Sequence, residues 1–374
     1  MVHILVLKKI EQGLILDRIF QVEPSISSDD IEAVNNYISS GSWITENKLT
    51  LELENNTRNY LGREYAVAVP NGTIAIYLSL LSAGIKDGMK VAVPNLTMIA
   101  TINAVLWANA EPILVDVDES LCMSYEKLLE LDEKIDCAIF VPLNGRTGEG
   151  EKIYKWCKEN EIIFIEDSAH ALGSNYESSK CGALGDLSIL SFTPHKIITM
   201  GQGGMVLTDD ESLYNYLISI KTFNRSKDKS DWHEGFGLNF KITDLQAALG
   251  ISQFEKLNFF VEKKLNTLKY YEENIQSNVL TVKLFKETEV PWFFDVEFDS
   301  KQIKDEFKEY LDKNGIETRD FYPALSSQKY LDEYKSDNLE YSENIYNRLL
   351  WLPSGNNISE EQLSFICETV SKFK

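Results

Sequence analysis

Short apolar runs alternate with helical patterns from about residue 65 of this 374-residue chain. Runs such as YAVAVP (65–70), KVAVP (90–94) and IIFIED (162–167) consist mostly of apolar residues, so each predicts a strand buried on both faces. Segments with helical periodicity, such as TIAIYLSLLSAGI, separate these runs. Buried strands joined by helical crossovers predict an α/β fold built on a mostly parallel sheet.

Further strands are expected at 112–117, 136–142, 187–192 and 204–210. Only a short turn region separates the last two, which favours an antiparallel pair over a crossover unit. The large sheet is therefore expected to be mixed, with most of its strands parallel.

The second part of the chain follows another pattern. A long amphipathic segment at 242–275 predicts helices that leave the sheet. A strand at 290–299, a helix ending at Gly315 and a C-terminal helix are expected after it. We expect a large domain with an N-terminal segment at 1–255 and a smaller α+β domain at 256–374.

Composition limits the partners and the location. The chain has 58 acidic and 37 basic residues, which gives a net charge of −21. Neither nucleic acid nor an anionic membrane is therefore an expected partner. The five scattered cysteines favour reduced thiols, and the four histidines show no metal-ligand spacing. The start of the chain lacks a signal-peptide cleavage pattern, and no apolar run is long enough to span a membrane. We expect a cytoplasmic protein without a metal site.

Four polar features follow predicted strands, where open α/β sheets bind ligands. The turn PNGT (70–73) opens a helix, so its N–H groups either bind a phosphate or simply cap the helix. Asp167 could cap a helix or pair with a buried cation. Ser191 could bind a phosphate or form a turn. Lys196, which most often would be a solvated lysine, precedes GQGG, whose glycines permit close backbone approach.

Together these features match the needs of pyridoxal 5′-phosphate (PLP). A lysine forms a Schiff base with the aldehyde. A carboxylate keeps the pyridine nitrogen protonated, so that the ring accepts electrons. The helix turn and the serine hold the phosphate, and the glycine-rich turn leaves the lysine room to move as an acid or base.

Six sequence blocks occur in a fixed order: GSWITE (41–46), VAVPNGTIAIYLSL (67–80), VPNLTMIATINAV (93–105), EDSAHALGS (166–174), SFTPHKIITMGQGGMVLTDD (191–210) and GFGLNFKITDLQAALGISQFEKL (235–257). Through these blocks nearly the whole chain resembles the DegT/DnrJ/EryC1/StrS family of PLP-dependent sugar aminotransferases. The resemblance implies an aspartate-aminotransferase-like fold, PLP fold type I.

The resemblance also implies a role for individual residues. Lys196 is the Schiff-base lysine, and Asp167 pairs with the pyridinium nitrogen. His170 lies near the phenolic oxygen of the cofactor. Asn239 reaches the phosphate of the neighbouring subunit's cofactor, which implies a homodimer with composite active sites. Three residues hold the phosphate within one chain: Gly72, Thr73 and Ser191.

Departures from the family pattern fall in blocks that we expect to face the substrate. Met98 stands where the family usually has an aromatic residue on the cofactor ring, and its sulfur can pack there. The segments 224–237 and 317–331 resemble the GDP-perosamine synthase-like branch, although Ser326 replaces a histidine. Substrate contacts are expected from Trp43, Thr45, Arg225, Arg319 and Tyr322. For the two arginines, surface ion pairs are the alternative.

The resemblance implies L-glutamate or L-glutamine as amino donor. It implies as acceptor a nucleotide-linked keto-deoxy sugar of the GDP-4-keto-6-deoxymannose type, used for surface polysaccharide. A small phosphorylated ketone is the alternative acceptor. A PLP-dependent 3-dehydratase would carry a histidine in place of the lysine, but here His195 precedes an intact Lys196. The pair of Lys196 and Asp167 also argues against a non-catalytic protein of this fold.

Overall fold

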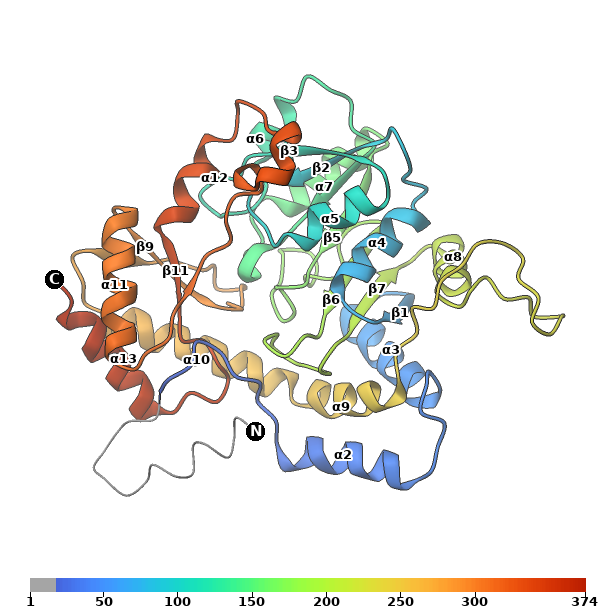
Figure 1. Cartoon of the computed structure of the whole chain (residues 1–374), viewed down its shortest axis with the longest axis horizontal. Coiled ribbons are helices and arrows are strands. Elements are labelled where there is room, and N and C mark those ends of the chain that lie inside the picture. The colour runs from blue at the N-terminus through green and yellow to red at the C-terminus, as the bar shows by residue number, and fades with distance from the viewer. Residues whose placement is uncertain (1–17) are drawn as a thin grey trace.

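The structure, a computed structural model, describes residues 18–374. The start of the chain, where we expect no signal peptide, lies outside these residues. Two sheets organise the described chain, and Figure 1 shows them on opposite sides with the helices α9 (Asp244–Glu255) and α10 (Leu257–Asn274) running past both. Lys256 marks the junction of these two helices. A domain boundary at this place stays a prediction.

The large sheet has seven strands in the order β1-β7-β6-β5-β4-β2-β3. These strands are β1 (Tyr65–Val69), β2 (Lys90–Pro94), β3 (Glu111–Val115), β4 (Cys137–Phe140), β5 (Ile163–Asp167), β6 (Leu187–Ser191) and β7 (Gly204–Thr208). β7 is antiparallel to both of its neighbours, and the other adjacent pairs are parallel. The expected mixed, mostly parallel sheet with an antiparallel pair of β6 and β7 is confirmed.

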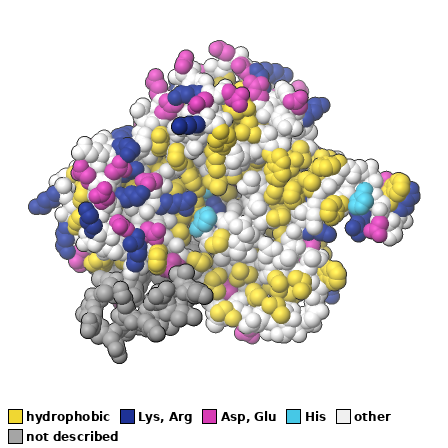
Figure 2. Space-filling model, viewed as in Figure 1, with side chains coloured by type: hydrophobic (Ala, Val, Ile, Leu, Met, Phe, Trp, Pro, Cys, Tyr) yellow, Lys and Arg dark blue, Asp and Glu magenta, His cyan; other side chains and the backbone are white. Residues whose placement is uncertain are grey.

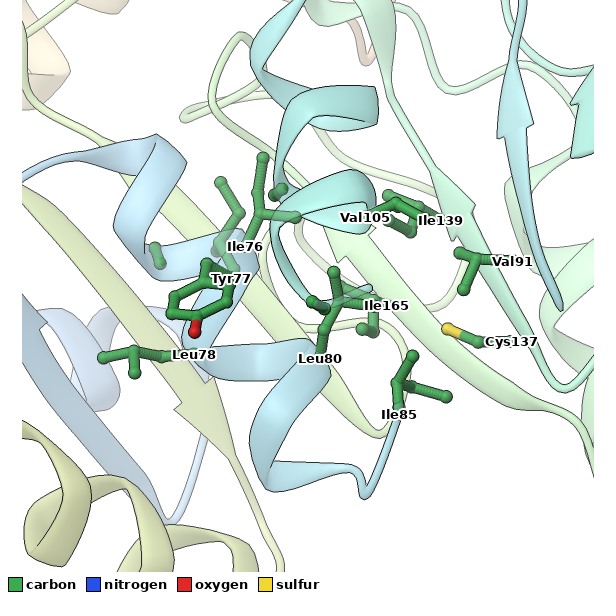
Figure 3. Packing of buried hydrophobic residues seen from close by; sticks show 14 of the residues in the cluster. Ile76, Tyr77, Leu78, Leu80, Ile85, Val91, Val105, Cys137, Ile139 and Ile165 are labelled. Carbon is green, nitrogen blue, oxygen red and sulfur yellow. The ribbon is translucent and has the colours of Figure 1, made fainter. Parts of the chain in front are cut away.

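Helices cover both faces of this sheet, which explains the apolar strands. The helices before and around it are α2 (Ser28–Ser39), α3 (Lys48–Leu61), α4 (Gly72–Ser82), α5 (Ala100–Trp107), α6 (Tyr125–Leu129), α7 (Gly150–Glu159) and α8 (Glu211–Lys221). Val91 and Ile139 pack with α4 and α5 on one face, as Figure 3 shows, whereas Ala92 and Phe140 pack on the opposite face near α7. Successive strand residues thus enter two different cores.

The small sheet is antiparallel throughout, in the order β10-β11-β9-β8. Its strands and helices are β8 (Leu280–Val282), β9 (Phe294–Phe298), α11 (Lys301–Lys313), β10 (Arg319–Asp320), α12 (Glu340–Ile345), β11 (Leu349–Leu352) and α13 (Glu360–Lys372). Short 3-10 turns lie at Leu143–Gly145, Leu325–Ser327, Lys329–Tyr334 and Tyr346–Arg348. Within residues 18–374, no helix is both long and apolar enough to cross a membrane.

The strand expected at 290–299 is shorter than the sequence suggests. Residues 290–293 instead contact the turn that follows β4, where the Asn144 side chain binds the backbone of Phe293 twice. Asn144 Nδ2 donates to Phe293 O at 2.8 Å, and Phe293 N donates to Asn144 Oδ1 at 2.7 Å. These bonds satisfy backbone groups that a sheet ladder would otherwise pair, so the strand begins only at Phe294.

Candidate active site

A cavity of about 510 Å³ lies at the carboxyl ends of the central strands β5 and β6. The first turn of α4, the loops after β2, β5 and β6, and the start of β10 all contribute to its walls. Most of the predicted site residues line it: Gly72, Thr73, Met98, Asp167, His170, Ser191, Lys196, Arg319 and Tyr322. The fold therefore assembles these residues from five separate segments.

Asp167 is the last residue of β5 and is buried. Thr101 Oγ1 of α5 donates to its Oδ2 at 2.9 Å, and the backbone N–H of Ala169 donates to its Oδ1 at 3.3 Å. Burial raises the pKa of this carboxyl above its ordinary value, although these bonds and the nearby Lys196 act in the opposite direction. A buried carboxylate with so few donors is suited to pairing with a cation.

Glu166, one residue earlier on β5, points to the other face of the sheet. It accepts hydrogen bonds from the Ser168 and Tyr176 hydroxyls and from the N–H groups of Gly182 and Leu184. Burial nevertheless raises the pKa of Glu166 to about 7. This second acid holds the segment before β6 in place and faces away from the cavity.

Lys196 lies in the turn between β6 and β7, where its backbone N–H donates to Thr193 O at 3.0 Å. Burial lowers the pKa of Lys196 to about 7, Asp167 raises it and Arg319 lowers it further. Its Nζ atom lies 4.0 Å from the centroid of the Trp292 ring. Near neutral pH the amine therefore exists in both protonation states, as a nucleophile or a proton carrier requires.

His170 follows β5 and is 4% exposed. Its imidazole stacks on Trp292, with ring centroids 4.1 Å apart, and faces Tyr322 at 5.8 Å. Burial, together with Lys196, holds the pKa of His170 well below its usual range. Its Nδ1 atom is buried without a hydrogen-bond partner among residues 18–374. A neutral imidazole with a free ring nitrogen is available to a ligand atom.

The first turn of α4 and the end of β6 form a close cradle. Asn71 caps the helix, since its Oδ1 accepts from Ile74 N at 3.0 Å. A Cβ atom added at Gly72 would lie 3.0 Å from Ser191 Cβ and 3.2 Å from Ser191 Oγ. Only glycine allows Ser191 to approach the helix N-terminus this closely. The free N–H groups of this turn and the serine hydroxyl are suited to a phosphate.

The outer part of the cavity carries Met98, Arg319 and Tyr322. Met98 is 40% exposed. The Arg319 guanidinium lies 5.4 Å from the Trp351 ring centroid and 5.9 Å from that of Tyr322. The ion pairs formed by arginines of residues 18–374 include neither Arg319 nor Arg225. Arg319 therefore remains available to an anionic ligand.

Four predicted residues line no part of this cavity within one chain: Trp43, Thr45, Arg225 and Asn239. All four are exposed, with Trp43 at 71%. Thr45 pairs with Thr243, while Arg225 and Asn239 belong to the segment between α8 and α9, which extends from the body as an arm (Figure 1). A single chain therefore does not bring these four residues to the cavity.

Ser326, which replaces a family histidine, does not face the cavity. It is buried and accepts from Asn95 Nδ2 at 3.0 Å, while its N–H donates to Asn95 Oδ1 at 2.8 Å. Its hydroxyl donates to Glu343 at 2.8 Å. Ser326 itself thus lies outside the cavity and links the loop after β2 to the segment before β11, whereas Arg319 and Tyr322 of the same block line the cavity.

Sequence reasoning missed two residues of the site, Thr101 and Trp292. Thr101 lies in a helix that the sequence predicts, and nothing in its neighbours indicates Asp167 as its partner. Trp292 belongs to the run PWFF, whose apolar residues predict a strand and give no sign of a site. Both contacts join segments far apart in the chain, and periodicity carries no signal for such pairs.

Comparison with known proteins accounts for this arrangement. The sequence profile of the DegT/DnrJ/EryC1/StrS aminotransferase family matches residues 24–371. The chain belongs to this family. It is thus an enzyme, an aminotransferase, and membership in the family implies PLP as its cofactor.

Individual relatives agree with the family. GDP-perosamine synthase of Escherichia coli O157:H7 is 33% identical over 356 residues, which cover 94% of this chain and 97% of that protein. PseC of Helicobacter pylori, an aminotransferase involved in the biosynthesis of pseudoaminic acid, has a TM-score of 0.89 at 25% identity, over 96% of this chain and 99% of its own. The PLP-form of Spr1654 from Streptococcus pneumoniae shares the fold, with a TM-score of 0.88 at 23% identity over 95% and 98% of the two chains.

Proposed function

We propose that the protein transfers an amino group from L-glutamate or L-glutamine to the keto group of a nucleotide-linked keto-deoxy sugar, of the GDP-4-keto-6-deoxymannose type. The observation that carries the proposal is the meeting of Lys196, Asp167 and the unpartnered Nδ1 of His170 in one cavity. The likeness to GDP-perosamine synthase supports this class of acceptor. A product of this kind suits the synthesis of surface polysaccharide.

The residues of the cavity fit PLP. Asp167 would hold the ring nitrogen, because a buried carboxylate with a raised pKa gains from a cationic partner. His170 Nδ1 would bind the phenolic oxygen, and Gly72, Thr73 and Ser191 would hold the phosphate. When bound, PLP supplies an electron sink for the carbon that loses a proton.

Lys196 would bind the cofactor covalently and, once released, carry protons at the reacting carbon. Its pKa of about 7 allows it to accept a proton and to return it near neutral pH. The turn that carries Lys196 contains Gly201, with φ +78°, and a Cβ there would meet no atom within 4 Å.

Arg319 and Tyr322 would contact the substrates at the mouth of the cavity. Arg319 has no carboxylate partner of its own, so it can bind the carboxylate of the donor or a phosphate of the acceptor. Met98 would pack against the cofactor ring through its polarisable sulfur. The amino donor and the acceptor would occupy this space one after the other.

We propose a homodimer in which Trp43, Thr45, Arg225 and Asn239 act at the neighbouring cavity. Figure 2 shows several groups of hydrophobic side chains on one face, whereas charged side chains gather elsewhere on it. Large apolar side chains are exposed on and after α2, among them Ile31 (57%) and Ile38 (59%), and Phe236 on the arm is 75% exposed. Such exposure is typical of surfaces that bind another protein.

The cofactor assignment is tested by reducing the PLP-loaded protein with sodium borohydride and mapping the modified peptide by mass spectrometry. We expect the cofactor on Lys196, and no modified peptide in Lys196→Ala. Modification of another lysine would contradict the proposal. Lys158, an exposed lysine paired with Asp186, serves as a control when changed to alanine.

The acceptor is tested by amination assays with GDP-4-keto-6-deoxymannose and with a small phosphorylated ketone, each with glutamate and with glutamine. We expect turnover of the nucleotide sugar. Turnover of the small ketone alone would favour the alternative acceptor. Release of a dehydrated sugar without amination would instead indicate a 3-dehydratase.

Composite sites are tested by mixing Lys196→Ala with Asn239→Asp, each inactive alone. A heterodimer would contain one site with both changes and one site with neither. After subunit exchange, we therefore expect about a quarter of the wild-type activity, since half of the dimers would carry one intact site of two. No recovery in a mixture that forms heterodimers would contradict the proposal.

A further inference from the structure

Trp292 lies two residues before β9, where the chain contacts the turn that follows β4 of the large sheet, and it is 1% exposed. Its ring stacks on the His170 imidazole with planes 15° apart, and the Nζ atom of Lys196 lies 4.0 Å from its centroid. One indole thus contacts two ionisable side chains of the site. It does so without a titratable group of its own.

We propose that Trp292 is a positioning residue, whose indole face stabilises the ammonium form of Lys196 and fixes the plane of the His170 imidazole. An aromatic face attracts a cation more strongly when the pair is shielded from water, and the indole of Trp292 is almost fully buried. The proposal rests on the proposed function in one respect, namely that Lys196 is the reactive amine.

Three hydrogen bonds hold Trp292 in place. Its indole Nε1–H donates to His195 O at 2.7 Å, and its backbone N–H donates to Asn144 O at 3.2 Å. Its carbonyl accepts from Lys264 Nζ at 2.7 Å. The first of these bonds ties the ring to the residue that directly precedes Lys196. The distance between the indole and the amine is therefore set by a short, direct link.

Lys264 adds to this fixation from α10. It is buried, and besides Trp292 O its ammonium donates to Ser354 O. Burial lowers the pKa of Lys264 to about 7. An ammonium buried with two carbonyl acceptors is costly unless it binds both, so it restrains the segment that carries Trp292. The restraint comes from the helix that leads into the small sheet.

The charges around Lys196 explain why an aromatic face matters. Asp167 favours the ammonium form, whereas burial and Arg319 oppose it. Burial holds His170 and His195 neutral, so neither adds a positive charge beside Lys196 and neither serves as its counter-ion. Without the indole, Asp167 alone would counter the burial. The amine would then hold its proton less well, and its ability to return a proton to the substrate would fall.

The test uses the full-length protein without PLP. Competitive labelling with acetic anhydride from about pH 5 to pH 9, followed by mass spectrometry of the peptide with Lys196, gives the pKa of its amine. We expect the pKa to fall from wild type to Trp292→Phe to Trp292→Leu, by roughly one unit in all. Trp351→Phe is the matched control, because Trp351 is equally buried and packs edge-on to Trp292 at 5.9 Å.

Equal pKa values in wild type and both Trp292 variants would overturn the proposal. If Trp292→Leu does not fold, the test rests on comparing Trp292→Phe with wild type. An unchanged pKa of Lys196 in Trp292→Phe would then overturn the proposal. An equal fall in Trp351→Phe would indicate loosened packing and overturn the specific role. Failure of the proposed function would be seen separately, as absence of borohydride-fixed cofactor on Lys196, because the labelling needs no cofactor.

Discussion

The hydroxyl of Thr101 donates a hydrogen bond of 2.9 Å to Oδ2 of Asp167. Thr101 lies in the first turns of α5, and Asp167 ends β5, so the bond joins a helix to the strand end beneath it. It fixes the orientation of the carboxylate. Oδ1, which accepts only a bond of 3.3 Å from Ala169 N, stays available to the cavity.

Asp167→Asn is expected to lower kcat at least about a hundredfold, because the amide cannot carry the charge that a protonated ring nitrogen needs. The substitution keeps the shape of the side chain and its bond with Thr101. Steady-state kinetics with saturating PLP measure the effect. A kcat within threefold of wild type would exclude Asp167 from the role proposed for it.

Thr101→Val is expected to lower kcat by about tenfold, because one hydrogen bond to a charged group is lost while the carboxylate remains. The effect of Thr101→Val should disappear in the Asp167→Asn background, since both act through the same carboxylate. Kinetics of the two single variants and the double variant test this. Fully additive losses would contradict the prediction.

Attachment of PLP to the cofactor-free protein is expected to speed up from pH 6 to pH 8 and then level off. Only the neutral amine attacks the aldehyde, and Lys196 has a pKa of about 7, so it is mostly protonated below that pH and mostly neutral above it. Stopped-flow absorbance gives the rate at each pH. Free Nα-acetyl-lysine, the control, should keep accelerating toward pH 10, and the same profile for the protein would contradict the prediction.

Gly72→Ala is expected to weaken PLP binding by about tenfold, because the added methyl would lie 3.0 Å from Ser191 Cβ and push apart the phosphate cradle. Equilibrium dialysis or fluorescence titration measures the affinity. Gly250→Ala is the matched control: it lies in α9, where a methyl would meet Leu53 at 3.2 Å, outside the cavity. Equal losses of PLP affinity in the two variants would contradict the prediction that Gly72 and Ser191 hold the phosphate.

Arg146→Met is expected to lower the free energy of unfolding by about 3–5 kcal/mol, because it leaves the Asp295 carboxylate buried without its ion-pair partner. Arg146 and Asp295 lie 2.8 Å apart, both are buried, and they join the large sheet to β9. Urea unfolding measures the change. Lys301→Ala, which breaks an exposed pair with Asp305, should cost less than about 0.5 kcal/mol.

The large sheet could be predicted from the sequence, since buried strands and short turns are local signals. The observed β5 at Ile163–Asp167 and the expected strand at 162–167 differ by one residue. The expected bounds of the strand at 290–299 are less accurate, because the hydrogen bonds between Phe293 and Asn144 determine where this strand begins. Such bonds depend on tertiary structure.

Part of the candidate site could likewise be predicted from the sequence, and part of it could not. The sequence placed Asp167, Lys196 and the turn before α4 at strand ends, and the structure brings them into one cavity. Thr101 and Trp292 could not be found, because their roles come from contacts with segments far away in the chain. Asn239 and Arg225 remain predictions, since a single chain does not bring them to the cavity.

Glu166 and Asp167 occupy successive positions of β5, and each is buried on its own face of the sheet. Four hydrogen-bond donors hold Glu166 behind the sheet, whereas Asp167 has two. A slip of β5 by one residue would exchange the two acids, leaving the shorter side chain to reach the donors of Glu166. The network behind the sheet therefore acts as a check on strand register, and only a correctly paired β5 delivers an aspartate to the cavity.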